Sequence, residues 1–146
     1  MPNHFFPPSG PQDKKRATAL SDGDRDYMLF SLEFTACILR ERPSHPEALL
    51  LAANYLTELG FYVDGLKIDR LLVALKPNDP QVLYNLACSL SLNSLLNEAF
   101  EVIHQAWANG FTNLELLRHD RDLELLRHDP RFHSLLSQLS PDKLPQ

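Results

Sequence analysis

An internal repeat constrains this chain more than any other feature. Displacing the sequence against itself by 34 residues superposes seven pairs of like residues between 43 and 106. The pairs are Pro43 with Pro77, Pro46 with Pro80, Leu49 with Leu83, Ala53 with Ala87, Leu56 with Leu90, Gly65 with Ala99 and Leu72 with Ala106. Chance accounts for one or two such pairs, so residues 46–111 are expected to hold two copies of one structural unit.

Each copy of the repeat carries the pattern of two consecutive helices. Apolar residues follow helical spacing over residues 46–59 and 62–75 in the first copy, and over 80–92 and 95–109 in the second. Proline cannot continue a helix, so Pro77 ends the first copy. The spacing of Ser44 with Glu47, and of Thr112 with Glu115, is that of a capping box at a helix start.

A further helix is predicted before the repeats, over residues 26–42. It has two apolar stripes, one with Phe30, Phe34, Cys37 and Ile38, and one with Met28, Leu32, Thr35 and Leu39. So broad an apolar surface predicts burial on more than one side. The helix ends at Pro43, in register with the repeat, which indicates the second helix of an incomplete unit.

After the repeats, one heptapeptide occurs twice. Leu-Glu-Leu-Leu-Arg-His-Asp fills residues 114–120 and again residues 123–129, and Pro130 then precedes a last predicted helix. A stacked helical array has to cover the apolar face of its last repeat. Residues 112–139 are therefore expected to act as a C-terminal cap.

These residues resemble the tetratricopeptide-repeat (TPR) family, which places small residues where the two helices of a unit cross. In the first copy the matching positions are Leu49, Ala52, Ala53, Leu56, Gly65, Asp69, Leu72 and Pro77, and in the second they are Leu83, Leu86, Ala87, Leu90, Ala99, Ile103, Ala106 and Phe111. Asp69, Leu72 and Phe111 depart from the family pattern. The ending resembles that of bacterial TPR proteins, at Asp122, Leu123, Leu126, Arg127, Asp129, Pro130, Arg131 and Phe132.

The resemblance implies an all-α fold, a right-handed α-solenoid of antiparallel helix pairs. About two full units would follow a preceding helix and end in a short-helix cap. The expected organisation is a flexible arm over residues 1–20, a single helical domain over 21–139 with repeats at 46–79 and 80–111, and a disordered tail over 140–146.

Composition excludes several function classes. The net charge of −5 comes from 14 basic and 19 acidic residues without a basic stripe, so no nucleic-acid partner is expected. No apolar run approaches the roughly 20 residues of a membrane span, and the chain start lacks the apolar core of a signal peptide. A cytoplasmic location follows, with no membrane partner.

No catalytic or metal-binding motif stands out. Three histidines, His119, His128 and His133, lie in the predicted cap, but no pair has the i, i+4 spacing of two ligands on one helical face. Cys37 and Cys88 lack a catalytic signature and fall in apolar helical stretches, where cysteine behaves as a small hydrophobe. We expect neither an enzyme nor a cofactor.

The resemblance implies a partner-binding groove lined by the first helices of successive units. The positions away from the core stripe are Leu50, Asn54, Thr57, Glu58, Gln81, Tyr84, Asn85 and Cys88. Side-chain amides there can bond the backbone of an extended peptide or a helix, while Leu50 and Tyr84 contact its side chains. An adaptor or scaffold that binds another protein is the favoured function.

Three alternatives stay open. The chain could self-associate as a homodimer through the edge near Phe30 and Phe34, because few repeats leave an apolar edge uncovered. It could be a non-catalytic subunit of an enzyme assembly. The Phe5-Phe6-Pro7-Pro8 segment could fold back into the groove of its own chain.

Overall fold

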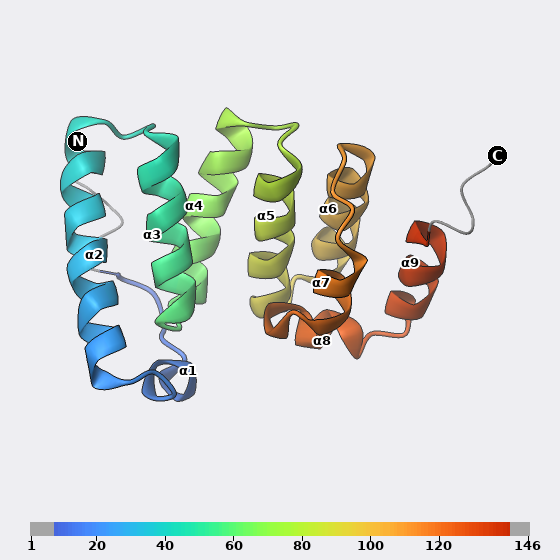
Figure 1. Cartoon of the computed structure of the whole chain (residues 1–146), viewed down its shortest axis with the longest axis horizontal. Coiled ribbons are helices and arrows are strands. Elements are labelled where there is room, and N and C mark those ends of the chain that lie inside the picture. Colours follow the sequence, from blue (N-terminus) through green and yellow to red (C-terminus); the bar gives the residue numbers. More distant parts are fainter. Residues whose placement is uncertain (1–7, 141–146) are drawn as a thin grey trace. The chain divides into compact units, whose positions relative to one another are not determined.

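All regular structure in the described residues is helical. The computed structural model describes residues 8–140, in which every regular element is a helix (Figure 1). This confirms the predicted all-α class. The chain divides into two compact units, residues 1–77 (unit 1) and 78–146 (unit 2). Among the helices of residues 8–140, none combines the length and apolar character needed to cross a bilayer.

Unit 1 consists of four helices. They are α1 (Lys14–Thr18), α2 (Asp22–Glu41), α3 (Pro46–Glu58) and α4 (Tyr62–Leu75). Helix α3 packs between α2 and α4. Its buried side chains, which form the centre of the unit, are Ala48, Leu49, Ala52, Ala53 and Leu56.

Two glycines set the path of the chain around α3. Gly60 follows the helix with φ of +87°, and a side chain there would collide with the carbonyl oxygen of Asp13. Gly65 lies where α4 crosses α3, and an added Cβ would be 2.9 Å from the Oγ1 atom of Thr57. Glycine therefore permits both the turn and the close approach of the two helices.

Residues 9–20 pack against α3 and α4 within unit 1, which differs from the flexible arm predicted over residues 1–20. The backbone N–H of Asp13 donates to the carbonyl oxygen of Gly60 at 2.8 Å, and that of Gly10 donates to the buried Asp64 carboxylate at 3.0 Å. Helix α1 begins where Asp13 caps it, and it buries Ala17. The sequence of this segment is mostly polar and gives no sign of these contacts, because they are made to residues far away in the chain. Residues 1–7, with Phe5 and Phe6, lie outside the described residues.

Helix α2 buries only one of its two apolar stripes. Leu32, Thr35, Ala36 and Leu39 are buried against unit 1, whereas Phe30 and Phe34 are 67% and 61% exposed. The prediction of burial on more than one side is wrong, because within unit 1 α2 packs mainly on α3.

Unit 2 begins with a longer helix pair and ends in short helices. The pair is α5 (Pro80–Leu92) and α6 (Leu96–Ala108). The short elements are α7 (Leu114–His119), the 3₁₀ helix η1 (Arg121–Leu123), α8 (Glu124–Arg127) and α9 (Arg131–Leu139). Element η1 packs on α5, and α8 packs on α5, α6 and α9, so this segment does cover apolar residues of the pair. The tail predicted over 140–146 lies outside the described residues except for Ser140.

Several helices, although not α4 or α6, begin at a side-chain cap, and the capping residue is not always the predicted one. Asp79 caps α5, accepting from the N–H groups of Gln81 and Val82. His45, not Ser44, caps α3, and Asn113, not Thr112, caps α7. Both predicted capping boxes are therefore wrong by one residue, since His45 and Asn113 have side-chain acceptors too.

Candidate functional site

Two of the predicted site residues lie on the outward side of α3. Asn54 is exposed and Leu50, one turn earlier, is half-buried. Neither belongs to the buried core of unit 1. Spacing of i, i+4 places them as neighbours on one helical face. The pair thus offers an apolar contact beside an amide that can both donate and accept hydrogen bonds.

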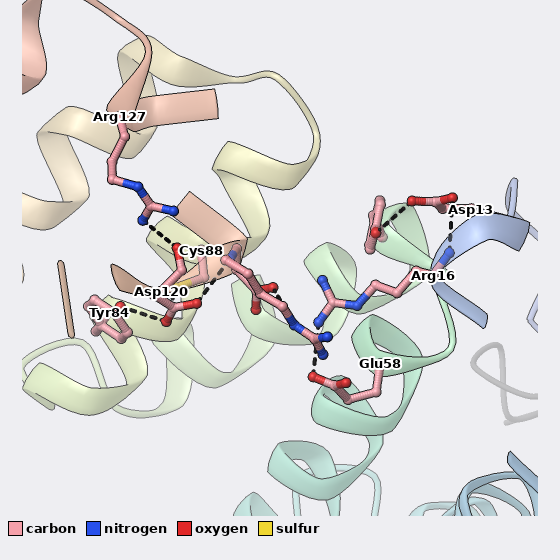
Figure 2. Close-up of polar contacts among 10 residues, drawn as sticks. Asp13, Arg16, Glu58, Tyr84, Cys88, Asp120 and Arg127 are labelled. Atoms are coloured by element: carbon pink, nitrogen blue, oxygen red, sulfur yellow. Dashed lines mark hydrogen bonds and ion pairs between the residues drawn. The ribbon is translucent and has the colours of Figure 1, made fainter. Parts of the chain in front are cut away.

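The next two predicted residues of α3 have structural contacts. Thr57 is half-buried at the crossing with α4, next to Gly65. Glu58 forms an ion pair of 2.9 Å with Arg16, whose side chain is 9% exposed (Figure 2). This ion pair holds residues 13–18 against the end of α3. We therefore assign Thr57 and Glu58 a structural role rather than a role in contacting a partner.

On α5, the amide pair Gln81 and Asn85 lies outside the core. The Nε2 atom of Gln81 donates to the Oδ1 atom of Asn85 at 2.9 Å, across one helical turn. Gln81 is exposed and Asn85 is half-buried. Each amide keeps further hydrogen-bonding capacity, because an amide has two donor hydrogens and two acceptor lone pairs.

Tyr84 is buried, contrary to its predicted role as a contact for a partner. Its ring stacks on that of Phe111, with centroids 4.4 Å apart and planes 7° apart. Its hydroxyl donates to the Oδ2 atom of Asp120 at 2.7 Å (Figure 2). Burial, with the neighbouring Cys88 and Asp120, raises the pKa of Tyr84 far above its usual value of 10.0, so the phenol stays neutral.

Asp120 joins the start of the cap to α5. Besides the Tyr84 hydroxyl, its Oδ2 atom lies 3.8 Å from the Sγ atom of Cys88, and its Oδ1 atom accepts from the N–H of Asp122. Its backbone carbonyl oxygen accepts from the guanidinium of Arg127 (Figure 2). Cys88 is 7% exposed. The prediction that Tyr84 and Cys88 contact a partner is therefore wrong: the chain's own residues 111–120 cover them.

The residues that cover this face, Phe111 and Asp120, escaped the sequence-based site. In the sequence, Phe111 is noticeable only because it replaces the proline of the TPR pattern. Asp120 is noticeable only as the last residue of a repeated heptapeptide. An aromatic residue in place of a proline, 27 residues after Tyr84, is the signal that the sequence holds. It does not specify which helix the ring meets.

The described residues 8–140 contain no group of three or more His, Cys, Asp or Glu side chains arranged to hold a metal ion. Comparison of the chain with protein-family models, curated proteins and solved structures finds no match. The candidate residues are therefore judged from the geometry of α3 within unit 1 and of α5 within unit 2, each by itself.

Proposed function

We propose that this chain is a TPR-like adaptor that binds an extended peptide of another protein on the outward face of α3. The helix pairs support the family assignment. Helices α3 and α5 both begin at a proline, Pro46 and Pro80, and α4 and α6 begin at Tyr62 and Leu96. Both shifts equal the 34 residues of the sequence repeat. A right-handed solenoid of about two units with a C-terminal cap is the arrangement that we propose.

The observation that carries the binding proposal is how unit 2 uses the equivalent face. In the 34-residue register, Leu50 corresponds to Tyr84 and Asn54 to Cys88. In unit 2, two residues of the same chain cover this position. They are Phe111, in the loop after α6, and Asp120, at the end of α7. That contact is an intramolecular example of a segment bound to the first helix of a repeat. In unit 1 Asn54 stays exposed, and we propose that a partner segment binds there.

The chemistry of α3 indicates what such a segment would offer. Leu50 provides an apolar contact of moderate size, and the Asn54 amide can pair with a peptide N–H and C=O group. Recognition of an extended peptide through backbone hydrogen bonds and one apolar pocket is a recurring mode. A cytoplasmic location and a bacterial source remain predictions from the sequence.

A peptide-display selection against the purified full-length chain tests this function. We expect enriched peptides with dissociation constants on the order of micromolar, and a loss of at least tenfold on Leu50→Glu. Leu71→Glu, on an exposed part of α4, is the matched control and should leave binding unchanged. Circular dichroism verifies that both variants fold.

Selected peptides that bind the Leu50→Glu variant as tightly as the wild type would contradict the proposed site. Peptides that lose affinity only on Leu71→Glu would move the site to α4.

A second function, self-assembly, is favoured by one separate observation, the exposed aromatic residues of α2.

A further inference from the structure

The outward face of α2 carries three exposed aromatic side chains. Tyr27, Phe30 and Phe34 are 63%, 67% and 61% exposed, and Cys37 on the same face is exposed as well. Within unit 1, α2 lies beside α3 (Figure 1), and the buried residues of α2, Leu32, Thr35, Ala36 and Leu39, fall on the other side of the helix. The Tyr27 ring, although largely exposed, also meets the Tyr55 ring of α3 edge to face, with centroids 6.4 Å apart. Scattered single apolar residues on a surface are ordinary, but a contiguous row of aromatic residues marks an interaction site.

The spacing of this row is that of a two-helix seam. Tyr27, Phe30, Phe34, Cys37 and Glu41 follow one another at intervals of three, four, three and four residues. This is the a/d pattern of a coiled coil, and it spans two heptads of α2. The surface therefore fits another helix laid along α2 better than it fits an extended peptide.

Charges along α2 are distributed unevenly between its two ends. Asp22, Asp24 and Asp26 lie in its first turns, and Arg40 and Arg42 lie at its end. Arg25 donates to the carbonyl oxygens of Ala17 and Leu20 and also pairs with Asp22 at 3.3 Å, so Asp24 and Asp26 carry the acidic charge of this end. An antiparallel copy of α2 would place the acidic end of one helix beside the basic end of the other, whereas a parallel copy would place like charges together.

We propose that the outward face of α2 binds the same face of a second copy of this chain, with the two helices antiparallel. A two-fold axis midway between Phe30 and Phe34 brings Phe30 of each copy against Phe34 of the other. The same register sets Tyr27 opposite Cys37. Glu41 then lies opposite Gly23, which has no side chain to oppose its charge. The surface is self-complementary, as an isologous dimer requires.

The charges near the two ends of α2 agree with this register, whereas the exposed Glu33 lies beside its own copy near the two-fold axis. In an antiparallel pair, each flank of one helix lies beside the same flank of its partner. At about 100° per residue, Arg40 shares a flank with Asp26, and Arg42 shares the other flank with Asp24. When Phe30 meets Phe34, Arg40 lies level with position 24 of the second copy and Arg42 level with position 22. Each arginine is therefore about 3 Å along the helix axis from its acidic partner, Asp26 or Asp24. The two-fold axis repeats them, which gives four ion pairs around the aromatic seam.

The aromatic residues also supply a useful interface area. At their present exposure, full burial of the three rings in both copies removes roughly 700 Å² from water. Specific interfaces begin at about 1,200 Å² in total. Cys37, Ile38 and the flanking charged side chains extend the seam toward that size, so we expect a weak, concentration-dependent dimer.

Sedimentation equilibrium of the full-length chain tests the association. We expect a monomer–dimer equilibrium in the wild type, a dissociation constant raised at least about 100-fold by Phe34→Glu, and no change in the Leu71→Glu control. Position 34 is exposed in the monomer, so this variant is expected to keep its fold. A wild type that stays monomeric up to millimolar concentration would overturn the proposal.

Disulfide cross-linking tests the orientation. One protein keeps only the thiol of Cys37, by Cys88→Ala, and the second carries a thiol only at position 27, by Tyr27→Cys, Cys37→Ala and Cys88→Ala. In the antiparallel register only the mixture forms a cross-linked dimer, because two copies of Cys37 lie about 15 Å apart along the helix axis. Cross-linking of each protein with itself, and not in the mixture, would show a parallel pair and overturn the proposal.

Deletion of residues 1–7 separates a second copy from an intramolecular occupant. We expect the shortened chain to dimerise as the wild type does. A monomeric full chain that dimerises only after this deletion would show that its own first residues cover α2. Neither result depends on peptide binding at Leu50, because the two faces belong to different helices.

Discussion

The same position of two repeats is open in unit 1 and covered in unit 2. Leu50 and Asn54 of α3 are half-buried and exposed, while their equivalents Tyr84 and Cys88 of α5 are buried. The helices begin alike, with proline at the first position. The difference arises from two residues that follow α6, Phe111 at the end of the second repeat and Asp120 in the cap. The repeat pattern thus determines where the helix forms, and the residues that follow the helix pair determine which face of that helix stays exposed.

The largest effect expected from this comparison is on stability. Tyr84→Ala removes a buried, stacked ring and should lower the free energy of unfolding by about 3–5 kcal/mol. Leu50→Ala, at the equivalent half-buried position, should cost only about 1 kcal/mol. Urea denaturation of dilute protein, followed by circular dichroism, measures both changes.

Tyr84→Phe separates the ring from its hydroxyl. The stacking on Phe111 is retained, but Asp120 loses a hydrogen bond, so we expect a cost of about 1–2 kcal/mol. Equal costs for Tyr84→Ala and Leu50→Ala would contradict the statement that only the α5 face is covered.

The sequence predicts the parts of this comparison that local chemistry determines. The 34-residue period and the positions of the four repeat helices follow from neighbouring residues, and the predicted helix bounds agree with the structure within one residue. The covered face of α5 and the ordered residues 9–20 depend on contacts between distant residues. The polarity of Asp13 and Asp120 gives no sign of their partners, Gly60 and Tyr84.

The helix before the repeats shows the same limit. Its two apolar stripes have similar sequence signals, yet one is buried and the other exposed. Hydrophobic pattern states which faces favour burial, but it does not state whether the covering surface lies in the same chain. Phe30 and Phe34 are therefore the residues at which the interpretation of the sequence was wrong for the isolated chain.

A smaller effect sharpens the comparison between the two copies of the heptapeptide. The first copy ends in Asp120, which accepts a hydrogen bond from the Tyr84 hydroxyl. The second copy ends in Asp129, which forms an ion pair with Arg131 at 2.8 Å. The side-chain hydrogen bonds from Arg131 lower the pKa of Asp129 to about 2. Because the folded pKa lies below the unfolded value, the stabilisation is present above about pH 4 and is lost as the pH falls toward 2.

Carboxyl chemical shifts of Asp129 measured against pH test this assignment. We expect Arg131→Ala to return the pKa of Asp129 toward its usual value of 3.8. An unchanged pKa of Asp129 in that variant would mean that Arg131 is not the group that lowers it.

Thiol labelling at the two equivalent positions tests the central claim most directly. In a Cys37→Ala background, Asn54→Cys with Cys88→Ala leaves a thiol on α3 only, and the native Cys88 alone leaves one on α5 only. We expect the thiol at position 54 to react with a chromogenic disulfide at nearly the rate of a free thiol, and Cys88 to react at least about 100-fold more slowly, through local opening of the cap. Equal rates at the two positions would contradict the account, since the face of α5 would then be as open as the face of α3.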